Sequence, residues 1–173
     1  LTAPNGPSQQ SVIRTALDVA DFQSVQYVNL EMHGTGTSLG DPIEIGAASA
    51  VLHSSGVERE PLSLWAAKTA HGHGEPAAGV VGVLHALSSI SHAHHYELTN
   101  LRIVNPYVAE TMDLNGKTFA PRQALAILSA WNLAQAATGI SSFAYQGTNG
   151  HINLCVEETG THEVVHRIVW SRQ

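Results

Sequence analysis

The sequence predicts an α/β fold in which a mixed β-sheet is sandwiched between helices. Segments with apolar residues at helical spacing alternate along the chain with short apolar runs typical of buried strands. Hydrophobic residues make up 43% of the 173 residues and charged residues only 13%, which favours extensive buried surface. One domain is the simplest organisation at this length. We expect it to span residues 1–160, with a tail or linker at 161–173.

The N-terminal region predicts one helix and one strand. Pro7 suits a first helical turn, where its missing N–H costs nothing. Apolar residues then recur at helical spacing, so we expect a helix over residues 7–20. Residues 25–32 form an apolar run typical of a buried strand.

The next region contains a clear helix start. Asp41 can act as the N-cap, Pro42 can take the first helical position, and Glu44 can reach back to the N–H of the cap. This pattern predicts a helix from Asp41 to about residue 53, and Leu62 to Ala67 then predicts a second short strand.

The second half of the chain predicts one long helix and then strands. Residues 75–95 have a helical pattern, and small residues at 77–79 and 82 predict a surface that another helix can approach closely. Residues 99–122 contain two turn signals and predict a long irregular excursion. The remaining apolar segments predict strands at 125–130, 139–145 and 151–157, and an apolar tail at 164–170 that docks or leads into a linker.

Composition excludes several classes of function. The net charge is −6 with neutral histidines, and no cluster of Lys and Arg occurs, which argues against nucleic acid as a partner. The most apolar run, 77–90, is too short to span a membrane and is interrupted by His85. A single cysteine, Cys155, excludes an internal disulfide and fits a reducing, cytoplasmic location. Without a signal sequence or an initiator methionine, the chain is expected to be a piece of a longer polypeptide.

Three histidine-containing loops carry the chemical signal, at residues 31–37, 68–73 and 143–151. Each follows a predicted strand and contains glycine, which lets the backbone approach a ligand closely. A histidine at position 33 can donate a hydrogen bond to an oxygen on which negative charge develops. Lys68 near His73 can tune the protonation of that imidazole, and the turn at 147–150 can present backbone N–H groups. The alternatives are a structural loop histidine, a solvated lysine and a plain hairpin turn.

Taken together, the three loops resemble motifs of the C-terminal half of a β-ketoacyl synthase of the modular (type I) polyketide synthases. The run His-Gly-Thr-Gly-Thr-Ser-Leu-Gly-Asp-Pro-Ile-Glu at 33–44 is similar to the first histidine motif of that family almost without change. Residues 68–79 resemble its lysine and second histidine motif, and 139–151 its closing motif. The resemblance covers nearly the whole chain. It implies a thiolase-like fold of two similar halves and a decarboxylative Claisen condensation.

The resemblance also implies roles for individual residues. His33 and His73 would hold the thioester oxygen of a malonyl group on the phosphopantetheine arm of an acyl carrier protein, and Lys68 would organise the site electrostatically. The nucleophilic cysteine of the family lies in the N-terminal half, so this chain alone is expected to be inactive. Cys155 stands in the last strand pattern and is not its equivalent, and His71 is an additional imidazole beside the site.

Further implied roles concern the carrier arm and the acyl pocket. Thr35 and Thr37 would contact the pantetheine arm, the N–H of Tyr145 would form part of the oxyanion hole, and Phe143 would gate the acyl pocket. Gln146 replaces a usual glycine, and it would be strained if that position required a positive φ.

Two rival hypotheses remain at the level of sequence. The chain can be part of a non-elongating homologue, serving as a docking or dimerisation module. It can also be a metal-binding module, using His71-x-His73 or the histidines at 92, 94 and 95, although no cysteine or carboxylate completes a recognised zinc spacing. Under the first interpretation, the partners are the N-terminal half of the synthase and the acyl carrier protein, in a homodimeric parent. We also expect the isolated half to self-associate through its exposed apolar surface.

Overall fold

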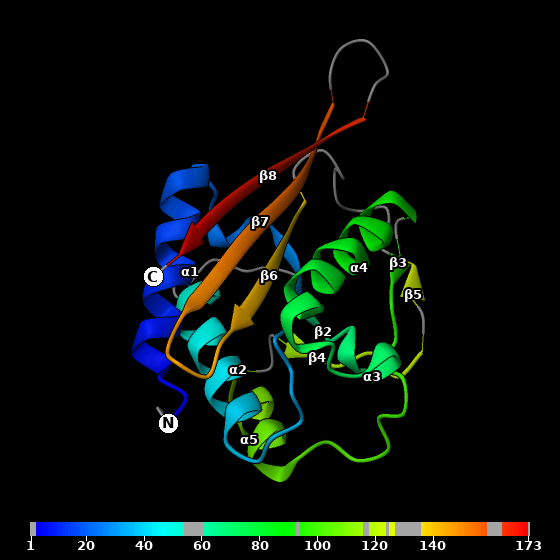
Figure 1. Cartoon of the computed structure of the whole chain (residues 1–173). Coiled ribbons are helices and arrows are strands. Elements are labelled where there is room, and N and C mark those ends of the chain that lie inside the picture. The colour runs from blue at the N-terminus through cyan, green and yellow to red at the C-terminus, as the bar shows by residue number, and fades with distance from the viewer. Residues whose placement is uncertain are drawn as a thin grey trace.

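A six-stranded mixed sheet forms the centre of the molecule (Figure 1). The computed structural model describes residues 3–53, 61–92, 94–115, 118–123, 125–126, 136–158 and 164–172. Along the sheet the strand order is β4-β2-β1-β6-β7-β8. The first four strands of this order run parallel, and β7 and β8 pair antiparallel. The strands are β1 (Tyr27–Glu31), β2 (Leu62–Trp65), β4 (Thr118–Phe119), β6 (Ala137–Phe143), β7 (Asn149–Glu158) and β8 (Val164–Arg172).

Helices cover both faces of this sheet, which confirms the predicted layered α/β architecture (Figure 1). Side chains alternate between the faces along each strand, so Leu30 and Glu31 of β1 face opposite layers. Leu30 packs in a cluster with α1 and α2, whereas Glu31 lies against α4. The helices are α1 (Gly6–Ala20), α2 (Gly40–Leu52), α3 (Lys68–His71), α4 (Ala78–His92) and α5 (Pro106–Asn115), with short 3-10 turns η1 (Ser24–Gln26) and η2 (Glu75–Ala77).

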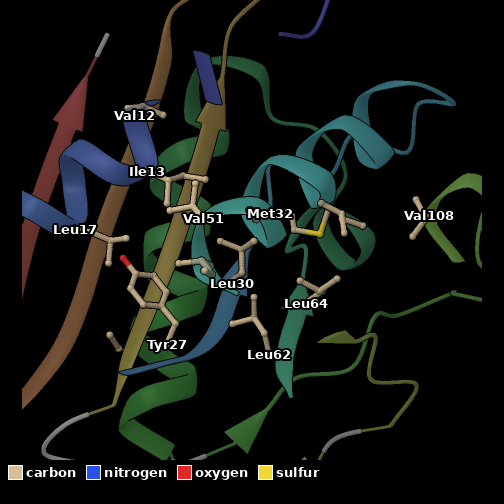
Figure 2. Close-up of a cluster of buried hydrophobic side chains, with 14 residues drawn as sticks. Val12, Ile13, Leu17, Tyr27, Leu30, Met32, Val51, Leu62, Leu64 and Val108 are labelled. Atoms are coloured by element: carbon tan, nitrogen blue, oxygen red, sulfur yellow. The ribbon is translucent and has the colours of Figure 1, made fainter. Parts of the chain in front are cut away.

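The larger apolar core lies between α1, α2 and the sheet. Figure 2 shows Val12, Ile13 and Leu17 from α1 facing Tyr27 and Leu30 of β1. Burying a side chain of this size stabilises the fold by about 1.5–3 kcal/mol. A smaller cluster on the other face comprises Ala86, Ile140 and Leu154, with partly buried neighbours from α4 and β7. The two clusters thus pack on opposite faces of the sheet.

The start of α1 agrees with the prediction, whereas the start of α2 corrects it. Asn5 caps α1 by accepting a hydrogen bond from the Ser8 N–H at 2.9 Å. At α2 the N-cap is Leu39, with no side-chain cap, so the predicted capping box is wrong. Asp41 lies inside the first turn, and Glu44 points to the loop that follows β1 instead of to its own helix end.

The region predicted to be irregular contains an additional helix and strand. The Asn105-Pro106 turn signal is the start of α5, where Asn105 Oδ1 accepts a hydrogen bond from the Tyr107 N–H at 2.9 Å. Residues 118–119 then form β4 at the edge of the sheet. The weak apolar periodicity of this stretch concealed both elements.

The long helix predicted at 75–95 corresponds to α4, which ends at His92, and two of its glycines lie against the sheet. His94–His95 form β3, paired antiparallel with β5 (Leu125–Ala126). A Cβ added at Gly79 would lie 3.3 Å from Ser142 Oγ, and one at Gly82 would lie 3.3 Å from Glu31 Cγ. Gly79 and Gly82 therefore face the sheet, and the predicted approach of another helix stays a prediction.

The apolar segment near the C-terminus is a strand of the main sheet. β8 pairs with β7 from Gly150↔Arg172 to Glu158↔Val164. The domain boundary at residue 160 remains a prediction. The predicted strand residues 127–130 lie outside the described residues. In the part of the chain that the structure describes, no helix is long and apolar enough to cross a membrane.

Candidate active site

The three predicted loops meet at one edge of the sheet because they follow three neighbouring strands. β1 pairs parallel with β2 on one side and with β6 on the other, and Glu31 aligns with both Trp65 and Ile140. The carboxyl ends of parallel strands lie at the same edge, where α/β proteins commonly bind ligands. The structure thus brings together His33 after β1, Lys68 after β2 and Phe143 at the end of β6.

His33 lies between two rings from the other loops. Its ring centroid is 5.7 Å from that of His73, with the two planes at 86°, and 5.6 Å from that of Phe143. Burial, and then the charges of Lys68 and His73, lower the pKa of His33 to about 4. The ring is therefore neutral at physiological pH and carries one N–H donor. Its Nδ1 is buried without a hydrogen-bond partner in the described structure.

Glu44 of α2 holds the backbone of the His33 loop. Its Oε1 accepts a hydrogen bond from the His33 N–H at 2.6 Å, and its Oε2 accepts one from the Gly34 N–H at 3.0 Å. Complete burial raises the pKa of Glu44 to about 8, while these two N–H groups act in the opposite direction. The side chain of Glu44 thus clamps the loop to α2 through both of its oxygens. The sequence pattern had assigned it to a helix cap because local spacing cannot reveal this contact.

Gly34 allows the loop to pass close to β2. Its φ is +47°, and an added Cβ would lie 2.7 Å from the Cβ of Ala66. Beyond it, Asp41 Oδ1 accepts a hydrogen bond from the Gly36 N–H at 3.2 Å, and Thr37 Oγ1 accepts one from the Gly40 N–H at 3.1 Å. Because Thr37 Oγ1 is the acceptor in this bond, the O–H of Thr37 can still donate a hydrogen bond to another group. The Thr37 side chain is exposed at the rim of the site, and that of Thr35 is half-buried.

Lys68 is the first residue of the short helix α3, and His73 follows shortly after the end of that helix. Lys68 begins α3 and is half-buried, and burial lowers the pKa of its ammonium group. Glu31, Glu44 and Asp41 oppose that shift through their negative charges. Gly72, with φ of 74°, then redirects the chain toward His73, whose Nδ1 accepts a hydrogen bond from the Glu75 N–H at 3.2 Å. Because Nδ1 accepts, the proton of a neutral His73 ring lies on Nε2.

The loop after β6 carries the two residues predicted from it, and their side chains have different surroundings. Phe143 lies against His33, whereas the Tyr145 side chain is 82% exposed. The turn is closed by hydrogen bonds from Ala144 N–H to Thr148 O at 2.9 Å and from Gly147 N–H to Ala144 O at 3.1 Å. Gly147 carries the positive φ of this turn, and Gln146 does not have one, so the conditional strain at Gln146 does not arise.

Two residues near the site were not identified from the sequence. Glu31 is buried at the end of β1, its Oε1 accepts a hydrogen bond from the Ala67 N–H at 2.6 Å, and its Oε2 lies 2.7 Å from His85 Nδ1. The available signals were a carboxylate at the end of an apolar strand and a histidine within the apolar run of α4. Neither is specific by itself.

Three further histidines of the described residues have other surroundings. His151 is buried in β7 as a structural residue, hydrogen-bonded to Ser141 at 3.0 Å, and burial lowers its pKa to about 4. His71 is exposed, and Nδ1 of His92 lies 2.7 Å from the Ser88 carbonyl oxygen. Among the described residues, no group of three or more His, Cys, Asp or Glu side chains could hold a metal ion. Cys155 is a buried thiol in β7.

The sequence is similar to a β-ketoacyl synthase family model and to known polyketide synthases. Residues 1–102 match the family model "Beta-ketoacyl synthase, C-terminal domain". The chain is 39% identical over 156 residues to mycoketide-CoA synthase of Mycobacterium tuberculosis, covering 88% of this chain and 4% of that protein. It is 38% identical over 157 residues to erythronolide synthase EryA3 of Saccharopolyspora erythraea, covering 88% of this chain and 5% of that protein.

Solved structures agree with these sequence relatives. An oxazolomycin ketosynthase domain from Streptomyces albus superimposes with a TM-score of 0.79 at 27% identity, over 93% of this chain and 27% of that one. Ketosynthase twelve of the bacillaene polyketide synthase from Bacillus amyloliquefaciens gives 0.77 at 29% identity, over 86% of this chain and 26% of that one. The chain therefore spans about a quarter of these solved ketosynthases and a much smaller share of the curated synthases. By its sequence, its fold and its matched motifs, the chain belongs to the β-ketoacyl synthase family, as the C-terminal domain.

Proposed function

We propose that this chain supplies half of the active site of a ketosynthase that extends acyl chains by decarboxylative Claisen condensation. The parent protein is then an acyltransferase of polyketide or fatty acid synthesis. The observation that carries the proposal is the pair of imidazoles, His33 and His73, with ring centroids 5.7 Å apart beside Lys68. Two N–H donors directed at the same oxygen stabilise it as it becomes an enolate oxygen.

The chemistry then proceeds in a balanced sequence. The bond between the malonyl α-carbon and its carboxylate breaks, carbon dioxide leaves, and the electron pair forms an enolate of the thioester. His33 and His73 donate hydrogen bonds to that oxygen. The α-carbon attacks the acyl thioester carbon, a new carbon–carbon bond forms, and the cysteine thiolate leaves. The low pKa of His33 keeps its ring neutral at physiological pH, so one ring nitrogen carries the N–H that donates to the enolate oxygen.

The other assignments concern substrate placement. Thr35 and Thr37 lie on the loop after β1, partly buried and exposed respectively, where they are suited to hydrogen bonds with a pantetheine arm. Phe143 lies against His33, where it would gate the acyl pocket. The backbone N–H of Tyr145 would complete the oxyanion hole together with the N–H of the nucleophile.

The proposed partners follow from the need for a nucleophilic cysteine that Cys155 does not provide. Cys155 is buried in β7 and belongs to the sheet, which supports an acyl-carrying cysteine in the N-terminal half of a longer protein. We therefore expect the isolated chain to be inactive, and the parent to act as a cytoplasmic homodimer with an acyl carrier protein. Exposed Val80 (63%) and Leu84 (60%), one turn apart on α4, support an apolar partner on that helix.

A decarboxylation and condensation assay tests the proposal. The parent protein containing both halves is supplied with radiolabelled malonyl carrier protein and an acyl donor, and carbon dioxide release and product are both measured. His33→Ala and His73→Ala should each lower decarboxylation by about a hundredfold or more. Cys155→Ser is the matched control and should retain activity.

The same assay separates the rival interpretations. Condensation by the 173-residue chain alone would refute the fragment interpretation. Decarboxylation without condensation by the parent would favour the non-elongating alternative. Full activity of both histidine variants would contradict the assigned chemistry.

A further inference from the structure

The carboxylate of Glu31 connects the loop that carries Lys68 to helix α4. Glu31 is the last residue of β1 and is only 2% exposed. One of its oxygens accepts the N–H of Ala67 at 2.6 Å, and the other lies 2.7 Å from Nδ1 of His85. Ala67 is the N-cap of α3, and Lys68 is the first residue of that helix. A single buried side chain therefore links three elements immediately behind Lys68.

The ring of His85 is itself held in place by two aromatic neighbours. It stacks on Tyr96 with centroids 4.8 Å apart and planes at 28°, and meets the edge of Trp65 at 5.7 Å. Tyr96 is fixed by a hydrogen bond of 2.8 Å between its hydroxyl and that of Ser88. One turn before His85, Gly82 leaves the space that the carboxylate needs, since an added Cβ would lie 3.3 Å from Glu31 Cγ.

The short helix α3 depends on this external contact. It has only four residues and no side-chain cap, so its own hydrogen bonds do little to fix its orientation. Its internal bonds run from Ala70 and His71 N–H to the Ala67 carbonyl, which makes Ala67 the pivot of the turn. The N–H of that same residue is the group that Glu31 accepts. Losing the carboxylate would leave a buried N–H unpaired at the pivot.

We propose that Glu31 and His85 are positioning residues, which hold Ala67 so that Lys68 and the His73 loop keep their places opposite His33. The proposal rests on the proposed function for its catalytic consequence. Its geometric content, that His85 orients Glu31 and Glu31 anchors the Ala67 N–H, is independent of any activity. Neither residue touches the reacting atoms.

Amide exchange and lysine titration measure the anchoring directly in the full 173-residue chain. His85→Phe keeps an aromatic ring but removes the hydrogen bond to Glu31, whereas His85→Asn offers an amide nitrogen near the position of Nδ1. His92→Phe is the matched control on the same helix, because His92 is exposed and its ring contacts a helix carbonyl. We expect the Ala67 amide to exchange at least tenfold faster in His85→Phe, with recovery in His85→Asn and no change in His92→Phe.

Glu31→Gln adds an electrostatic readout. The chain contains two lysines, Lys68 and Lys117, so isotope-labelled lysine gives two side-chain signals that Lys117→Arg assigns. Because the charge of Glu31 raises the pKa of Lys68 against the effect of burial, Glu31→Gln should lower that pKa. Circular dichroism establishes that each variant is folded, and Glu31→Gln with its lysine readout carries the test if His85→Phe does not fold.

Kinetics of the parent protein test the catalytic consequence. Misplacing Lys68 and His73 should lower kcat for decarboxylation about ten- to a hundredfold in His85→Phe with little change in KM, and His85→Asn should restore most of it. An unchanged Ala67 amide in folded His85→Phe would overturn the proposal, as would unchanged kcat despite a freed amide. If the wild-type parent releases no carbon dioxide, the proposed function fails, and the amide and lysine measurements alone decide whether Glu31 and His85 hold the turn.

Discussion

Substituting Gly34 tests how closely the His33 loop must approach the sheet. Gly34→Ala introduces two separate costs. The residue has φ of +47°, in the left-handed region, where an L-residue loses about 1–2 kcal/mol. Its new Cβ would also lie 2.7 Å from the Cβ of Ala66, which is backbone-anchored and cannot rotate away. Overpacking of this kind costs about 1–3 kcal/mol.

The two costs together predict a loss of about 2–5 kcal/mol in the free energy of unfolding. That is a large share of the roughly 5–15 kcal/mol by which ordinary domains are stable. Gly36→Ala isolates the first cost, because Gly36 has φ of +73° but no heavy atom lies within 4 Å of an added Cβ. It should lose about 1–2 kcal/mol. Gly46→Ala, within α2 and also in open space, should gain about 0.5–1 kcal/mol.

Urea denaturation of the wild-type chain and the three variants measures these differences at constant m-value. The expected order of stability is Gly46→Ala, wild type, Gly36→Ala and Gly34→Ala. If Gly34→Ala is as stable as Gly36→Ala within about 0.5 kcal/mol, the close approach to Ala66 does not limit the loop. The account of why glycine is required after His33 would then be wrong.

Three further predictions follow from the buried groups. Glu44→Ala should lower the free energy of unfolding by about 2–5 kcal/mol, because it leaves the N–H groups of His33 and Gly34 unpaired. Urea denaturation measures this loss, and a loss below about 1 kcal/mol would contradict the role of Glu44 in holding the loop. His33 and His151 each have a pKa near 4 when folded against 6.5 when unfolded, so their contribution to stability is full above pH 6.5 and is lost as the pH falls from 6.5 toward 4. Unfolding measured against pH should show a flatter slope in His151→Gln, and an unchanged slope would refute its burial as a neutral ring. Cys155 is buried, so a thiol reagent should label it in urea at least a hundredfold faster than in buffer; equal rates would contradict its place in β7.

Much of the layered fold could be predicted from local pattern. The helix at 7–20 and the strands at 25–32 and 62–67 correspond to α1, β1 and β2 with small shifts at their ends. Apolar periodicity indicates which positions are buried, and in these elements the buried positions recur at regular helix or strand spacing. The pattern failed at 99–122, because α5 has little apolar periodicity and its start at Asn105 has the same residues as a turn.

The candidate site could be predicted in outline but not in its supporting contacts. The loops of His33, Lys68 and Phe143 have a recognisable glycine-rich composition after strands, the roles of these residues follow from the resemblance to the family, and the structure brings the loops to one edge. Glu44 was misassigned as a capping residue, although its carboxylate binds N–H groups ten and eleven positions earlier in the chain. The expected role of Tyr145 concerns its backbone N–H and stays a prediction, while its side chain lies in solvent.

The sequence by itself determined the order of the main helices and strands outside residues 99–122, the three loops and the resemblance to the family, since each is written in residues that are close together in the chain. Only the tertiary structure decided that His33 is a neutral ring beside His73, that Glu44 holds its backbone, and that Glu31 and His85 lie behind Lys68. These properties arise from parallel strand pairing, which places groups distant in sequence within a few ångströms of each other. Burial there sets the protonation and hydrogen bonding of each group, and no local pattern encodes that burial.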